Sequence, residues 1–226
     1  MQEAIHIVVI RFSAMGDVAM AVPIVRLVLK QHPHLHITFV SNQFLAPLFK
    51  NIHRCTFFPA DTKGAHKGMA GLWKLHAQLK KLQKFEAVAD LHNVLRSKIL
   101  RSFFTLSAVR NSVIDKGRAE KKKLTARENK ILHPLPSSHQ RYADVFARLG
   151  FPVDLLAGEI AAKENIPAEM QAYIQPGKKL IGIAPFAQHA EKMYPLQKMK
   201  LFLQQLSGAA NVQLLFFAAP GSEANL

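Results

Sequence analysis

The stretch "IHIVVIRFSAMGDV", Ile5 to Val18, decides the fold. It opens with a continuous apolar run of strand length, which is typical of a parallel strand buried on both faces. Apolar residues then recur at helical spacing from Val18 to Leu29, until Pro33 ends the pattern. A buried strand, a short loop with a glycine and a helix predict the first unit of a doubly wound α/β domain.

Strand and helix patterns continue to alternate along the chain. Further strands are predicted in HITFVS, CTFFPA, FEAVADLH and NSVIDK, with helices around QFLAPLFKN, LWKLHAQLKKLQK and residues 94–105. A helix in SSHQRYADVFARLG has Ser137 or Ser138 as its expected N-cap and Gly150 after its end. These elements predict one Rossmann-like domain with a parallel sheet over residues 1–165.

A second alternation begins after a segment rich in proline and glycine. The strand LIGIAPF, a helix from about Pro195 to Leu206 and the strand VQLLFFAA fall within residues 166–226. Two strands and one helix cannot enclose a core by themselves. We therefore expect an incomplete second Rossmann-like domain, within which the chain ends.

The composition restricts the compartment and the partners. The 226 residues include one cysteine, Cys55, which cannot form an intrachain disulfide and favours a reducing compartment. We see no secretory leader and no apolar run of roughly 20 residues that could span a membrane, so we expect a cytoplasmic protein. The formal net charge of +15 indicates an anionic partner, either nucleic acid, phospholipid head groups or a phosphorylated substrate.

The densest basic cluster lies between residues 115 and 130. It contains no aromatic residue, which argues against a base-stacking surface. A solvated loop or helix face is the simplest interpretation. Alternatively, Lys116 to Lys130 attract the protein to an anionic acceptor at the inner face of the cytoplasmic membrane. A basic nucleic-acid-binding protein remains a competing hypothesis from another functional class.

Common cofactor and metal motifs are missing from the sequence. The loop after the first strand matches neither GxGxxG nor GxxxxGK[ST], which argues against a nicotinamide dehydrogenase and a P-loop NTPase. No histidine pair has metal-ligand spacing, so His66, His76, His92 and His133 are interpreted as packing or surface residues. We expect no bound metal and no cofactor.

Two loops that follow buried strands hold the candidate site residues. Gly16 would let the backbone approach a ligand, and Asp17 is either the N-cap of the following helix or a general base. In the second loop, Lys192 precedes a helix N-terminus, where a lysine and free backbone amides could hold a diphosphate. An exposed lysine that is merely solvated is the alternative there.

Four segments resemble the bacterial ADP-heptose:lipopolysaccharide heptosyltransferase family, whose architecture is the two-domain GT-B glycosyltransferase fold. They are IHIVVIRFSAMGDVAMAVPIVRLVLKQHP, VADLHNVLRSKIL, HQRYADVFARLG and IGIAPFAQHAEKMYPLQKM. The resemblance spans nearly the whole chain. It implies a metal-independent transfer of a heptose, or a related sugar, from a nucleotide-diphosphate donor to a lipopolysaccharide core or similar anionic glycolipid acceptor, without specific binding of nucleic acid.

The resemblance also implies roles for individual residues. Asp17 would deprotonate the acceptor hydroxyl, and Lys192 would bind the donor diphosphate and offset charge on the departing nucleotide. Glu223 matches the region where the family places an acidic residue against the donor. The donor-binding residues implied by the resemblance are Ser13, Met15, Gly16, Gln188, Lys192 and Glu223.

The sequence departs from the family in two places. Ala187 and Gln188 stand where better-known members have hydroxyl residues, which leaves the donor open between ADP-heptose and a related sugar nucleotide. The family's later segment, with an Asp-Ser/Thr-Gly and a His loop near the donor phosphates, has no counterpart in the sequence. A noncatalytic fragment of a glycosyltransferase is therefore another alternative.

Overall fold

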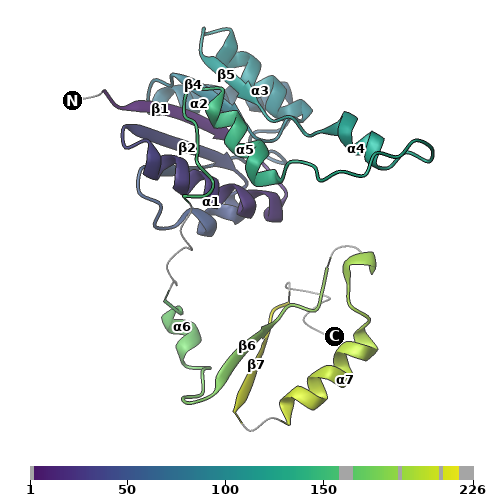
Figure 1. The fold of residues 1–226 in the computed structure, drawn as a ribbon. Helices are drawn as coiled ribbons and strands as arrows, with labels where there is room; N and C mark the ends of the chain where they lie inside the picture. The colour runs from purple at the N-terminus through teal and green to yellow at the C-terminus, as the bar shows by residue number, and fades with distance from the viewer. Residues whose placement is uncertain (1–2, 158–164, 188–189, 209–210, 219–226) are drawn as a thin grey trace. The chain divides into compact units, whose positions relative to one another are not determined.

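The computed structural model describes residues 3–157, 165–187, 190–208 and 211–218. The chain divides into two compact units, unit 1 (Met1–Ala161) and unit 2 (Ala162–Leu226). Figure 1 draws unit 1 from purple to green and unit 2 from green to yellow.

Unit 1 contains a five-stranded sheet in which all neighbouring strands are parallel. Its strands are β1 (Ile5–Ile10), β2 (Leu35–Ser41), β3 (Cys55–Pro59), β4 (Ala87–Asp90) and β5 (Arg110–Val113). The order β3-β2-β1-β4-β5 places β1 in the centre (Figure 1). The predicted doubly wound sheet is confirmed, and its switch point lies between β1 and β4, where such sheets bind ligands.

Helices cover both faces of this sheet. They are α1 (Met15–Gln31), α2 (Gly68–Leu82), α3 (Leu95–Thr105) and α5 (Ser138–Ala147). Unit 1 also contains the 3₁₀ helix η1 (Gln43–Phe49) and the helix α4 (Arg118–Leu124). Side chains of α1 and α5 share one apolar cluster with the sheet, and those of α2 and α3 share another. The Ser137 hydroxyl accepts a hydrogen bond from the Gln140 amide at 3.1 Å, which confirms the predicted N-cap of α5.

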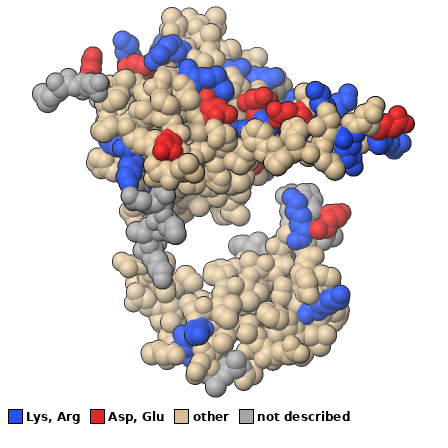
Figure 2. All heavy atoms as spheres, viewed as in Figure 1, with Lys and Arg blue, Asp and Glu red and all other residues tan. Residues whose placement is uncertain are grey.

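Helix α4 and the residues after it extend from the side of unit 1 (Figure 1). None of the residues of α4 is buried, which agrees with a solvated helix face. Charges of both signs occur here, with Lys121–Lys123 next to Glu120. Figure 2 shows blue and red atoms together on this projection.

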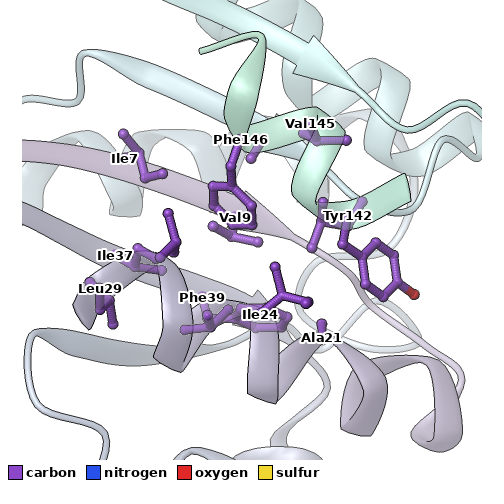
Figure 3. Packing of buried hydrophobic residues seen from close by; sticks show 14 of the residues in the cluster. Ile7, Val9, Ala21, Ile24, Leu29, Ile37, Phe39, Tyr142, Val145 and Phe146 are labelled. Carbon is purple, nitrogen blue, oxygen red and sulfur yellow. The ribbon is translucent and has the colours of Figure 1, made fainter. Parts of the chain in front are cut away.

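The cluster under α1 and α5 supports the loop that follows β1. Val9 and Phe39 from the sheet are fully buried and lie between Ile24 of α1 and Phe146 of α5 (Figure 3). Burial of each such side chain contributes about 1.5–3 kcal/mol. Tyr142 lies at the edge of the cluster, and its hydroxyl points away from the apolar side chains (Figure 3). The loop after β1 therefore starts from a rigid base.

Unit 2 contains a second parallel strand pair. Its elements are α6 (Ala168–Gln171), β6 (Lys179–Ile183), the 3₁₀ helix η2 (Ala190–Lys192), α7 (Leu196–Ser207) and β7 (Val212–Phe216). Strands β6 and β7 pair with Ile181 opposite Leu214. The predicted strand, helix and strand are confirmed, although α7 begins one residue later than predicted because Pro195 is its N-cap.

Candidate active site

Asp17 lies in the first turn of α1, directly beyond the carboxyl end of β1. The helix begins at Met15, its N-cap is Ala14, and the Val18 amide donates to the Ala14 carbonyl at 3.0 Å. The interpretation of Asp17 as the N-cap is therefore wrong, because the helix starts earlier than the apolar pattern indicates. Its carboxylate remains free for another role and benefits from the positive end of the helix dipole.

The guanidinium of Arg11 binds the Asp17 carboxylate. The two side chains form an ion pair, in which Arg11 is 8% exposed and Asp17 is 41% exposed. The Arg11 guanidinium also donates to the Leu91 carbonyl and lies 5.9 Å from the centre of the Tyr142 ring. Since Arg11 is fixed by β4 and α5 as well as by the ion pair, Asp17 is presented to solvent in a defined orientation.

The Tyr142 hydroxyl fixes the same turn through the backbone. It donates to the Asp17 carbonyl at 3.1 Å, across 125 positions of sequence. The start of α1 is thus tied to α5, and the Asp17 side chain is left exposed. This arrangement suits a carboxylate that must meet a second molecule in a fixed geometry.

Asp90, at the end of β4, has a different environment. It is fully buried, and its Oδ1 accepts from the amides of His92 at 2.9 Å and Asn93 at 2.8 Å. Its Oδ2 accepts from Arg101 at 3.0 Å. Because Asp90 is enclosed and bound on both oxygens, Asp17 is the carboxylate of the two that a molecule from solvent can reach.

His92 and Lys116 are two ionisable side chains near Asp17 whose pKa values are lowered. Burial, with help from the positive charges of Arg11 and Lys116, lowers the pKa of His92 to about 4. His92 is therefore neutral at physiological pH, and its Nδ1 accepts a hydrogen bond from the Phe12 amide at 3.4 Å. Burial and the nearby Arg11 also lower the pKa of Lys116, while Asp90 and Asp17 oppose this shift. Lys116 therefore interacts electrostatically with both carboxylates.

The structure brings the predicted loop residues together in unit 1. Ser13, Met15 and Gly16 are exposed beside Asp17, and a Cβ added to Gly16 would meet nothing within 4 Å. The open space next to Gly16 agrees with a backbone that a ligand can approach, because packing alone would tolerate a larger residue there.

The predicted residues of the second loop belong to unit 2. Lys192 is exposed at the end of η2, three residues before the N-cap of α7. Gln188 and Glu223 lie outside the described residues. Their roles, and those of Lys192 and the residues beside Asp17, stay predictions.

Arg11, Lys116 and His92 are site residues that the sequence did not reveal. Arg11 offered one signal, since it directly follows a buried strand of apolar residues. Lys116 was hidden in a basic run, and His92 has no motif. Among the described residues, no group of three or more His, Cys, Asp and Glu side chains could hold a metal ion.

Comparisons with known proteins identify relatives in sequence and in fold. No family model matches the chain. The lipopolysaccharide core heptosyltransferase OpsX of Haemophilus influenzae is 33% identical over 92 residues, which are 41% of this chain and 25% of OpsX. Over these residues the chain is similar to a heptosyltransferase. The match spans only about a quarter of the length of this curated relative.

Solved structures of glycosyltransferases share the fold. A glycosyl transferase family 9 protein from Veillonella parvula superposes with a TM-score of 0.73 at 19% identity, covering 97% of this chain and 64% of that one. Escherichia coli heptosyltransferase WaaC, solved with ADP-2-deoxy-2-fluoro heptose, has a TM-score of 0.63 at 16% identity, covering 96% of this chain and 70% of WaaC. The resemblance to the heptosyltransferases and the GT-B fold expected from it are confirmed.

Proposed function

We propose that this heptosyltransferase relative transfers a heptose, or a related sugar, from a nucleotide-diphosphate donor to a lipopolysaccharide core or similar glycan. One observation carries the proposal: Asp17 is an exposed carboxylate that Arg11 holds at the carboxyl end of the central strand. Ligands of open α/β sheets bind at this edge. The similarity to OpsX, a lipopolysaccharide core heptosyltransferase, supports glycosyl transfer as the reaction class.

In this mechanism Asp17 acts as the general base. Its carboxylate takes the proton of an acceptor hydroxyl while the hydroxyl oxygen forms a bond to the anomeric carbon of the donor sugar. The bond from that carbon to the diphosphate oxygen breaks, and the nucleoside diphosphate leaves with the electron pair. Lys192 and the amides at the start of α7 stabilise the charge that develops on the diphosphate, so that no metal ion is required.

We propose ADP-heptose as the first donor to test. WaaC, which shares the fold, has been solved with ADP and with ADP-2-deoxy-2-fluoro heptose. Ala187 is half-buried in the loop after β6, near Lys192 in sequence, where it offers no hydroxyl to a phosphate. A related sugar nucleotide is therefore the second donor to test.

We further propose that the acceptor is an anionic glycolipid at the inner face of the cytoplasmic membrane and that the protein binds this surface peripherally. The net charge of +15 supports an anionic partner. No helix in the described part of the chain is long and apolar enough to cross a bilayer. Basic residues of the segment 116–130 add long-range attraction to such a surface, which salt weakens.

Release of ADP from ADP-heptose tests this function. We expect release that depends on a lipopolysaccharide-core acceptor and persists in EDTA. Donor binding without acceptor-dependent release would favour the noncatalytic alternative. Retention on DNA or RNA with a steep salt dependence, together with indifference to sugar nucleotides, would favour the nucleic-acid-binding alternative and overturn the proposal.

A further inference from the structure

The outer surface of α2 and α3 exposes a group of large apolar side chains. Met69, Trp73 and Leu106 are 61%, 56% and 84% exposed. The Trp73 ring meets Phe103 of α3 edge-on, with 5.0 Å between ring centres, and so covers the seam between the two helices. Met69 precedes Trp73 by four residues and Leu106 follows Phe103 by three, which are spacings that place residues on one helix face. An exposed apolar group of this kind marks an interaction surface.

The charged side chains of α2 and α3 all have one sign. Helices α2 and α3 contain no Asp or Glu, and their basic residues are Lys74, Lys80, Lys81, Arg96, Lys98 and Arg101. Arg101 is paired with buried Asp90, and the other five are exposed. This differs from α4, where Glu120 accompanies the lysines.

A hollow at the end of the helix pair adds a place for an anionic group. It has a volume of about 310 Å³ and is lined by Lys80 and Lys84 together with the aromatic rings of Phe85 and Phe104. Two ammonium groups beside an apolar lining suit a phosphate that is attached to a hydrocarbon chain.

We propose that the face formed by α2 and α3 docks onto an anionic lipid membrane, with Trp73 at its centre. Tryptophan rings favour the membrane interface because they are amphipathic, and the lysines around Trp73 would meet the lipid phosphates. This proposal rests on the proposed function in one respect, which is that a protein acting on a membrane-bound glycolipid must reach the membrane surface. A nucleic acid fits less well, since one exposed aromatic residue offers no row of stacking platforms.

Trp73 is its own reporter, because it is the single tryptophan of the chain. We expect its fluorescence to move to shorter wavelength when the 226-residue protein meets vesicles of phosphatidylcholine with phosphatidylglycerol, and to be quenched by lipids brominated on the acyl chains. Vesicles of phosphatidylcholine alone should bind at least tenfold more weakly. An unchanged spectrum with anionic vesicles, or tighter binding to single-stranded DNA that displaces the vesicles, would overturn the proposal.

Two matched triple variants locate the docking face. Replacement of Lys74, Lys80 and Lys81 of α2 by glutamine should weaken vesicle binding about 100-fold, from about fivefold for each basic residue near the surface. Replacement of Lys121, Lys122 and Lys123 of α4 by glutamine removes the same charge and should cost less than tenfold. All six lysines are exposed, so both variants should fold. Equal losses in the two variants, or a larger loss in the α4 variant, would refute docking through α2 and α3.

The variants also separate this inference from the proposed function. ADP release with a soluble acceptor fragment should be the same in the α2 variant and in the unmodified protein. The reason is that none of the three lysines replaced in α2 belongs to the Asp17 site. If the unmodified protein binds anionic vesicles through Trp73 but releases no ADP, the transferase proposal fails and the docking face stands.

Discussion

Two neighbouring strands of unit 1 each lead to an aspartate that is paired with an arginine, yet the two loops differ in accessibility. After β4, Asp90 is fully buried and both of its oxygens are bound. After β1, Asp17 is 41% exposed although its partner Arg11 is buried. A carboxylate at the end of a strand is therefore not in itself a candidate for catalysis. Because of this difference we propose Asp17, and not Asp90, as the general base.

Replacing Asp90 should have the largest effect on stability. Asp90→Ala leaves the Arg101 charge and two backbone amides without their acceptor, and we expect a loss of about 3–5 kcal/mol in the free energy of unfolding. Urea denaturation measures this loss. The matched variant Asp17→Ala should lose less, because Arg11 keeps its hydrogen bond to the Leu91 carbonyl and water can reach the place of the lost carboxylate. Similar losses in the two variants would remove the distinction between the loops.

Replacing Arg11 should reduce turnover more than binding. Arg11→Gln frees the Asp17 carboxylate to rotate, and a catalytic group that is misplaced by about 1 Å can cost about 10²-fold in rate. We expect kcat to fall by about 10–100-fold while KM for the donor changes little. Tyr142→Phe is the control, since it removes only the hydrogen bond to the Asp17 backbone. Equal rates for Arg11→Gln and Tyr142→Phe would argue against a positioning role.

His92 should make the loop after β4 sensitive to acid. Its pKa is about 4 in the folded protein, against about 6.5 in the unfolded chain, so the unfolded state binds more protons between these values. Stability is complete above pH of about 6.5 and falls as the pH drops toward 4. Thermal melts of the unmodified protein and His92→Asn should diverge over this range, with a weaker pH dependence in the variant. Parallel curves would contradict this assignment.

The smallest effect concerns Gly16. Alanine stabilises a helix by up to about 1 kcal/mol relative to glycine, and the added Cβ would meet nothing within 4 Å. We expect Gly16→Ala to melt at the same or a slightly higher temperature and to bind the donor more weakly. A variant with improved stability and an unchanged KM would show that Gly16 does not serve close approach of the donor.

The sequence predicts the fold well because the fold depends on local patterns. Apolar runs of strand length and apolar residues at helical spacing can be recognised within a short stretch of sequence. The same is true of Ser137 as the N-cap of α5. The start of α1 was misplaced because its first turn contains few buried residues, so the backbone bond from Val18 to Ala14 decides where it begins. Periodicity cannot show such a bond.

The candidate site was predicted only in part. Asp17 and Gly16 follow a buried strand and can be found from that position alone. Arg11 and its contacts could not, because Leu91 and Tyr142 are far from it in sequence and meet it only in the folded sheet. Lys116 likewise becomes part of the site through its nearness to Asp17 and Asp90, which a basic run does not reveal.

The most direct test of Asp17 as the general base compares the Asp17→Asn variant with the unmodified protein. Acceptor-dependent ADP release and donor affinity are measured for both. An asparagine keeps the shape of the side chain and its exposed position, but it cannot accept the acceptor proton. We predict unchanged donor affinity, a small fall in melting temperature from the lost ion pair with Arg11, and kcat lower by about 10²–10⁴-fold. An Asp17→Asn protein that transfers the sugar at the unmodified rate would contradict it.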